Sequence, residues 1–165
     1  MSRDQPQRKK RLLILLAVVL MLGGVGYSYY RHHYPYGNSH HCSKAVVAGL
    51  LAYADDHVGA FPSAKNSAEA LVLLADYVPI EFLAGKSVKP SETTEYYTQH
   101  GTLSEEVCGW HYVSGLKSTD SGEITIMWPK VPLGHNGERL KEPAYEVIFV
   151  DGSVRYIKEL SLIHI

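Results

Sequence analysis

The longest hydrophobic segment of the chain is an uncharged run of nineteen residues, Leu12 to Tyr30, with the sequence LLILLAVVLMLGGVGYSYY. A helix of about this length can cross the hydrocarbon core of a bilayer. The pattern therefore predicts a transmembrane anchor over residues 12–30. A cleaved signal peptide is the alternative, because the strongly apolar core from Leu12 to Leu22 is short and Gly24 and Gly26 are small enough to precede a cleavage site.

The residues before this run are strongly basic. Residues 1–11 contain five Lys or Arg and one Asp, a net charge of +4, so the net charge of −1 for the whole chain leaves −5 for the remainder. Positive residues beside a membrane helix stay in the cytoplasm. We therefore expect a single-pass protein with a cytoplasmic head at residues 1–11 and an exported C-terminal part. The acidic remainder gives no basis for nucleic-acid binding.

After the apolar run the hydrophobic spacing changes to that of an amphipathic helix. The period of Val46, Val47, Leu50, Leu51 and Ala54 predicts a helix over about residues 39–57, with these side chains in one buried stripe. The chain then offers two residues that end a helix, Gly59 and Pro62. The carboxylates of Asp55 and Asp56 in the last turn are explained either by solvation or by a polar or metal contact with a later loop.

The next segments predict a short helix and then a loop. The stretch Ser67 to Val78 favours a second helix with Ser67 as its N-cap and an apolar face formed by Leu71, Leu74 and Val78. Residues 86–106 are polar and rich in Ser and Thr, which predicts a mobile loop.

Strand patterns fill the C-terminal third. Runs at residues 108–116 and 123–129 are rich in β-branched and aromatic residues and are separated by a turn around Asp120. Two further runs flank Asp151-Gly152, a pair that suits a type I′ hairpin. The sequence therefore predicts an α+β fold in which the helix before Gly59 packs on a small antiparallel sheet.

Five residues around the end of the first predicted helix resemble the pseudopilins of bacterial type II secretion systems. That family has a tyrosine on its long helix, then an acidic residue, a glycine and an aromatic-proline pair. The matching residues here are Tyr53, Asp56, Gly59, Phe61 and Pro62. The stretch from Ser67 to Val78 resembles the second short helix of the same family.

The C-terminal region resembles the prepilin-type H-X9-DG proteins, which are named for a histidine followed by an Asp-Gly pair. His135 and the pair Asp151-Gly152 carry this resemblance. Nine residues separate the two parts in the usual pattern, whereas fifteen separate them here, so a shared role for the histidine does not transfer directly. We interpret Asp151-Gly152 mainly as a pair that forms a turn, and the alternative is that Asp151 is catalytic.

Together the resemblances imply a bacterial inner-membrane protein with a periplasmic, pilin-like ectodomain. They imply a structural or interaction role beside secretion or surface-assembly proteins, with no cofactor and no enzymatic activity. The chain departs from true pilins because Arg11 runs straight into Leu12 without a processing glycine, and the apolar helix lacks their glutamate. We therefore expect an anchored monomer instead of a filament subunit.

Metal binding is the competing function. The predicted hinge at residues 31–41 contains four histidines, and imidazole binds zinc, copper and nickel, while carboxylates in loops can bind calcium. Adjacent histidines do not easily face one ion, so a solvated linker is the simpler interpretation. The candidate metal ligands are His40, His41, Asp56, His57 and Asp120.

The two cysteines, Cys42 and Cys108, both lie in the part expected to be exported. They could form a disulfide in an oxidising compartment or remain as two buried thiols. No CxxC, GxSxG, P-loop or HExxH motif is present, so the sequence indicates no catalytic residues.

The last six residues, LSLIHI at 160–165, match the translation of a transposon end sequence used in preparing DNA libraries. We interpret them as adapter read-through and expect the ectodomain to cover residues 42–159.

Overall fold

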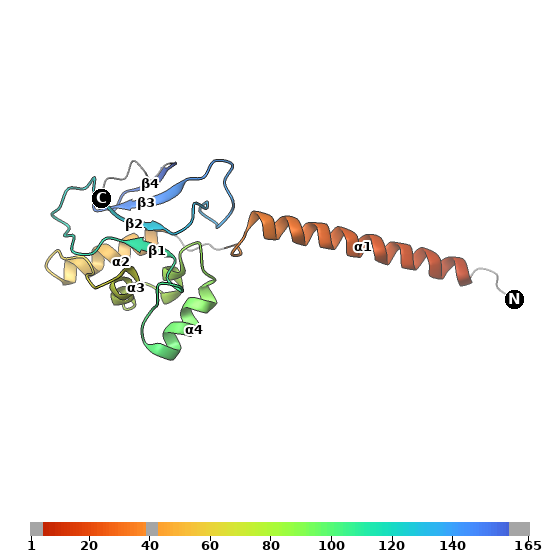
Figure 1. The fold of residues 1–165 in the computed structure, drawn as a ribbon, viewed down its shortest axis with the longest axis horizontal. Coiled ribbons are helices and arrows are strands. Elements are labelled where there is room, and N and C mark those ends of the chain that lie inside the picture. The colour runs from red at the N-terminus through yellow and green to blue at the C-terminus, as the bar shows by residue number, and fades with distance from the viewer. Residues whose placement is uncertain (1–4, 39–42, 159–165) are drawn as a thin grey trace.

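The computed structural model describes residues 5–38 and 43–158. Helix α1 (Gln5–His33) extends away from the rest of the molecule as a single straight rod (Figure 1). Its segment Arg8–His33 is long and apolar enough to cross a membrane, and its most apolar window contains no buried residue. The predicted long apolar helix is therefore present, and it is longer than residues 12–30 at both ends.

The hinge begins later than the sequence predicts. α1 continues through His33, because residues 31–33 contain nothing that breaks a helix. The chain then turns at Tyr34, whose backbone N–H donates to Tyr30 O at 2.8 Å, and Pro35 disfavours further helix at the residue before it. Thus the first three residues of the predicted hinge belong to α1.

Helix α2 (Ser43–Asp56) carries the expected buried stripe with one correction. Val46, Leu50 and Ala54 are each at most 2% exposed and face the core. Leu51, however, is 38% exposed. It lies one residue beyond the stripe, at its margin, so the apolar pattern overstated the width of the buried face.

A pair of left-handed residues ends α2. Gly59, with φ of 81°, donates its N–H to Ala54 O at 2.7 Å, as predicted for a glycine that terminates a helix. Val58 before it has φ of 56°, the only positive φ outside glycine in residues 5–38 and 43–158. Val58 is also 98% exposed, so no packing contact explains this conformation.

The second predicted helix is shorter than expected and has a different cap. It comprises α3 (Ser67–Leu71) and the 3-10 turn η1 (Val72–Leu74). The N-cap is Asn66, because its side chain accepts from Glu69 N at 2.8 Å, which corrects the prediction of Ser67. Leu71, Leu74 and Val78 are buried as expected. A further 3-10 turn, η2 (Ile80–Ala84), follows.

The predicted mobile loop contains helix α4 (Pro90–His100) instead. Pro90 occupies the first turn, where its missing N–H costs nothing, and Gly101 ends the helix with φ of 66°. Thr93 is fully buried and its Oγ1 donates to Val107 O at 2.7 Å. This long-range contact orders a segment whose polar composition alone suggests a loop.

Four antiparallel strands form one sheet in the order β1-β2-β3-β4. They are β1 (Trp110–Tyr112), β2 (Thr125–Pro129), β3 (Tyr145–Phe149) and β4 (Val154–Ile157). Helices α2, α3 and α4 lie on one side of the sheet (Figure 1). The buried faces of α2, β2 and β3 share one apolar core, which agrees with the expected α+β arrangement.

The β3-β4 hairpin lies where the sequence predicts it, but its turn is of another type. Gly152 N donates to Phe149 O at 2.9 Å and Phe149 N donates to Ser153 O at 3.0 Å. Only Gly152 has a positive φ, of 77°, and Asp151 does not. A type I′ turn needs positive φ at both positions, so the loop is a three-residue connection ending in a glycine bulge.

Candidate functional site

Tyr53 and Asp56, two residues of the sequence motif around the end of α2, belong to one contact cluster with His57 and Tyr77. The rings of Tyr53 and His57 stack with centroids 3.8 Å apart, and His57 Nδ1 lies 2.7 Å from Tyr53 O. Tyr77 packs edge-on against Tyr53 and donates its hydroxyl to Asp56 Oδ2 at 3.0 Å. We call Tyr53, Asp56, His57 and Tyr77 the helix-end cluster.

This cluster bears on both explanations for the acidic helix end. The carboxylates of Asp55 and Asp56 are both exposed to solvent, and Asp56 also makes a polar contact with a later segment. Desolvation and the hydrogen bond to Asp56 raise the pKa of Tyr77, so its hydroxyl remains a donor at neutral pH. The contact joins α2 to the segment after η1, which the sequence did not identify.

The other residues of the same sequence motif, Gly59, Phe61 and Pro62, connect the chain after α2 to β1 and the loop that follows it. Phe61 is 3% exposed, and its N–H donates to Leu116 O at 3.1 Å. Tyr112 donates its hydroxyl to Pro62 O at 2.7 Å, and burial raises the pKa of Tyr112. Gly59 O accepts from Ser118 N at 2.8 Å. The motif thus fixes the chain after α2 against the loop that follows β1.

The candidate metal ligands that the structure describes have protein partners. Asp56 and His57 belong to the helix-end cluster, and Asp120 Oδ2 accepts from Lys117 N at 2.7 Å within a turn. Residues 5–38 and 43–158 contain no group of three His, Cys, Asp or Glu side chains placed to hold one ion. His40 and His41 lie outside the described residues, so metal binding through them stays a prediction.

His135 occupies a tight turn above a buried polar cluster. Gly134 N donates to Glu138 O at 2.8 Å, and Gly137 closes the turn with φ of 82°. His135 Nδ1 lies 3.5 Å from Glu146 Oε1. In the described part of the chain, His135 therefore pairs with a carboxylate of β3, while Asp151 accepts from Ser153 N in its own turn at 2.8 Å.

The cluster below this turn was missed by the sequence interpretation. Glu146 is 6% exposed and its Oε2 accepts from Ser43 Oγ at 2.5 Å, at the start of α2. Lys86 is 2% exposed, and its ammonium donates to His135 O. The start of α2, the residue Lys86 and the region that contains His135 and Glu146 thus lie next to one another. The sequence signal for this cluster was a glutamate, Glu146, within the otherwise apolar run of β3.

Cys108 is fully buried, and its sulfur lies 3.8 Å from Trp110 O. Burial raises the pKa of its thiol to about 11, which leaves little nucleophilic thiolate at neutral pH. Cys42 lies outside the described residues, so the disulfide stays a prediction.

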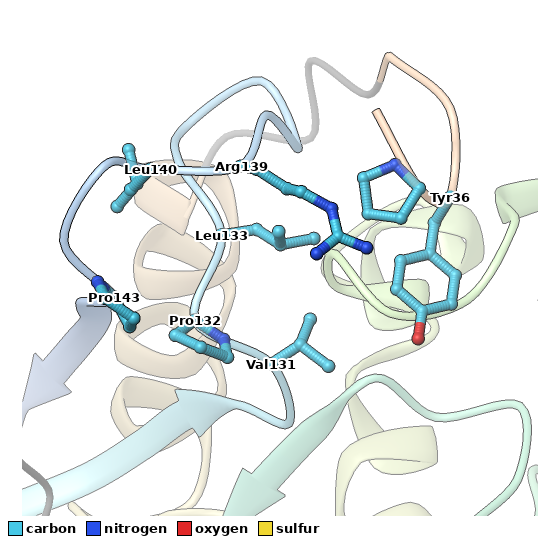
Figure 2. A pocket seen from close by; sticks show the side chains of 8 residues that line it. Tyr36, Val131, Pro132, Leu133, Arg139, Leu140 and Pro143 are labelled. Carbon is cyan, nitrogen blue, oxygen red and sulfur yellow. The ribbon is translucent and has the colours of Figure 1, made fainter. Parts of the chain in front are cut away.

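A surface cavity of about 290 Å³ lies at the junction of α1 and the folded domain, which we define as residues 43–158. Pro35 and Tyr36, just after α1, form one wall, and the β2-β3 connection forms the other (Figure 2). The guanidinium of Arg139 reaches between Leu133 and Tyr36 in this view. The lining residues of the β2-β3 connection are Val131, Pro132, Leu133, Arg139, Leu140 and Pro143.

Comparison with known proteins adds no identification to this geometry. No protein-family model matches the chain, and no curated protein or solved structure matches it either.

Proposed function

We propose that this protein is a membrane-anchored, exported interaction protein with a pilin-like ectodomain, related to the pseudopilins of type II secretion. One observation carries the membrane anchor in this proposal: the segment Arg8–His33 of α1 is apolar, long enough to span a bilayer and not covered by the folded domain. An exposed apolar helix of this length is unfavourable in water and is stabilised in a bilayer.

The two ends of α1 support an orientation with the N-terminus in the cytoplasm. Arg8, Lys9, Lys10 and Arg11 precede its apolar part. Tyr27 and Tyr29 are about two-thirds exposed near its other end, where aromatic rings favour the membrane interface. The folded domain then lies in the periplasm.

The pilin-like resemblance supports a scaffolding role for the folded domain. Its motif residues hold α2 to neighbouring segments through the helix-end cluster and through Phe61 and Pro62. A rigid helix on a sheet presents a stable surface to secretion or surface-assembly proteins, which we propose as its partners.

A topology experiment tests the proposal. Alkaline phosphatase, which is active only outside the cytoplasm, is fused after Ile157 in the full chain. We expect an active fusion that stays in the membrane pellet after alkaline carbonate extraction. Reversing Lys9, Lys10 and Arg11 to Glu is the matched control and is expected to reduce export. An inactive fusion contradicts the orientation, and release of a fragment beginning near Tyr27 contradicts the anchor in favour of signal cleavage.

A further inference from the structure

The cavity beside α1 combines one cationic side chain with apolar walls. We propose that it binds the phosphate head group of an anionic phospholipid, with the Arg139 guanidinium as the phosphate ligand. This inference rests on the proposed membrane anchor.

The first argument is position. The backbone N–H of Arg139 donates to His33 O, the last residue of α1, at 2.8 Å. This hydrogen bond holds the β2-β3 connection against the end of the helix, and Pro35 and Tyr36 complete the cavity within three residues of that end. If α1 spans the bilayer, the cavity lies at the level of the lipid head groups.

The second argument is the state of the guanidinium. Within the described residues, no ion pair involves Arg139, and the two nearest acidic residues in sequence are engaged elsewhere. Glu138 accepts from Asn136 N at 2.8 Å, and Glu142 pairs with Lys158. The other arginine of the folded domain, Arg155, is held by Glu123 at 2.8 and 3.1 Å. Of the two arginines, Arg139 is the one whose guanidinium has no carboxylate partner in the part of the chain that the structure describes.

The third argument is chemical fit. A planar guanidinium can donate two parallel hydrogen bonds to a phosphate, which a neutral donor cannot match in strength. Val131 and Leu133 place apolar surface near it, and Leu140 lines the cavity farther away (Figure 2), so a glycerol or the first acyl carbons would lie there. About 290 Å³ accommodates a head group, with the acyl chains left outside in the bilayer.

The test uses the full chain purified in mild detergent, with native mass spectrometry to count retained lipid. Phosphatidylglycerol is added in one arm, phosphatidylcholine in a second and inorganic phosphate in a third. We expect one phosphatidylglycerol per chain, and Arg139→Gln should lower its apparent affinity about tenfold or more. Lys141→Gln is the matched control, because it removes one charge from the same connection without lining the cavity.

Val131→Trp is a second variant, which fills the cavity and keeps Arg139. It should reduce lipid retention as Arg139→Gln does, while both variants keep the melting temperature of the wild type. Equal losses for Arg139→Gln and Lys141→Gln, equal retention of the two lipids, or displacement by inorganic phosphate would each overturn the inference. Carbonate extraction of the wild type is scored separately: release from the membrane refutes the anchor, whereas an anchored protein without Arg139-dependent lipid refutes only the lipid site.

Discussion

Gly49 of α2 lies directly against Val78, so closely that a β-carbon at Gly49 would fall 2.3 Å from Val78 Cγ1. Gly49 is in the middle of the helix, where glycine is less favourable than alanine by about 1 kcal/mol. The close approach explains its presence, because it lets the chain after η1 pack onto α2 and brings Tyr77 to Asp56.

Gly49→Ala should therefore destabilise the protein. The gain in helix propensity is about 1 kcal/mol, whereas forcing a methyl group into a packed contact costs about 1–3 kcal/mol. We expect a net loss in the free energy of unfolding, measured by urea denaturation. Ala52→Gly is the control: Ala52 is on the exposed side of α2, so this change measures the difference in helix propensity between alanine and glycine without a packing contact. A Gly49→Ala variant more stable than the wild type would show that α2 and Val78 are farther apart.

A second prediction follows from the buried face of α2, which includes Leu50 but not Leu51. Leu50→Ala should cost about 2–5 kcal/mol, since Leu50 is 2% exposed and its removal leaves a cavity in the core. Leu51→Ala should cost about 1 kcal/mol or less, because Leu51 is 38% exposed. Chemical denaturation of the two variants measures the difference. Equal costs would restore the broader stripe that the sequence suggested.

The margin of that stripe shows what periodicity can and cannot predict. Local spacing identified α2, the burial of Leu50 and Ala54, and the glycine that ends the helix. Local spacing could not predict the exposure of Leu51, because the exposure of a residue at the edge of a stripe depends on how far the neighbouring elements extend. The same limit applies to α4, which depends on a bond from Thr93 to Val107 outside the helix.

The candidate sites also divide into features that the local sequence predicts and features that depend on long-range contacts. The hairpin was located by Asp151-Gly152, but its turn type depends on how many residues the strands leave unpaired, which composition does not encode. The pairing of Ser43 with Glu146 spans 103 positions in the chain. No local pattern predicts such a contact, because it depends on how α2 sits on the sheet.

The third prediction concerns Val58. A β-branched residue in the left-handed region is strained by about 1–2 kcal/mol, and Val58 is 98% exposed with φ of 56°. Val58→Asn should raise the free energy of unfolding by about 1 kcal/mol, since asparagine tolerates this conformation. Thermal melting checks it, with Val58→Ile as a control that keeps the β-branch and should bring no gain. A destabilised Val58→Asn variant would mean that valine makes a contact that outweighs its strain.

A fourth prediction tests the hairpin bulge. Gly152 has φ of 77°, and a β-carbon there would approach Leu51 Cδ1 and Val47 Cγ1 at 3.3 Å each. Gly152→Val should therefore lower the free energy of unfolding by about 1–3 kcal/mol. Asp151→Asn should be nearly neutral, because an amide oxygen can still accept from Ser153 N. Equal melting temperatures for wild type and Gly152→Val would contradict the assigned turn.

The last prediction concerns pH and Glu105, whose carboxylate joins α3 to the end of β2. Glu105 accepts from Ala68 N at 2.8 Å and from Lys130 Nζ at 2.9 Å. Partial burial raises the pKa of Glu105, but the hydrogen bonds from Lys130 and Ala68 outweigh it and leave the pKa below its ordinary 4.5. A carboxylate with a depressed pKa stabilises the fold fully above the ordinary pKa, and this stabilisation is lost as the pH falls below it.

Glu105→Gln should thus be less stable than the wild type at neutral pH, by up to about 1 kcal/mol because the pair is partly exposed. The difference should shrink as the pH falls below the ordinary carboxyl pKa of 4.5 and through the lower pKa of Glu105, where the wild-type carboxylate also becomes neutral. Urea denaturation at several pH values measures it. Glu106→Gln is the matched control, since the exposed Glu106 makes no ion pair within the described residues. A difference that grew on acidification would show that the folded state stabilises the neutral form of Glu105 and not its carboxylate.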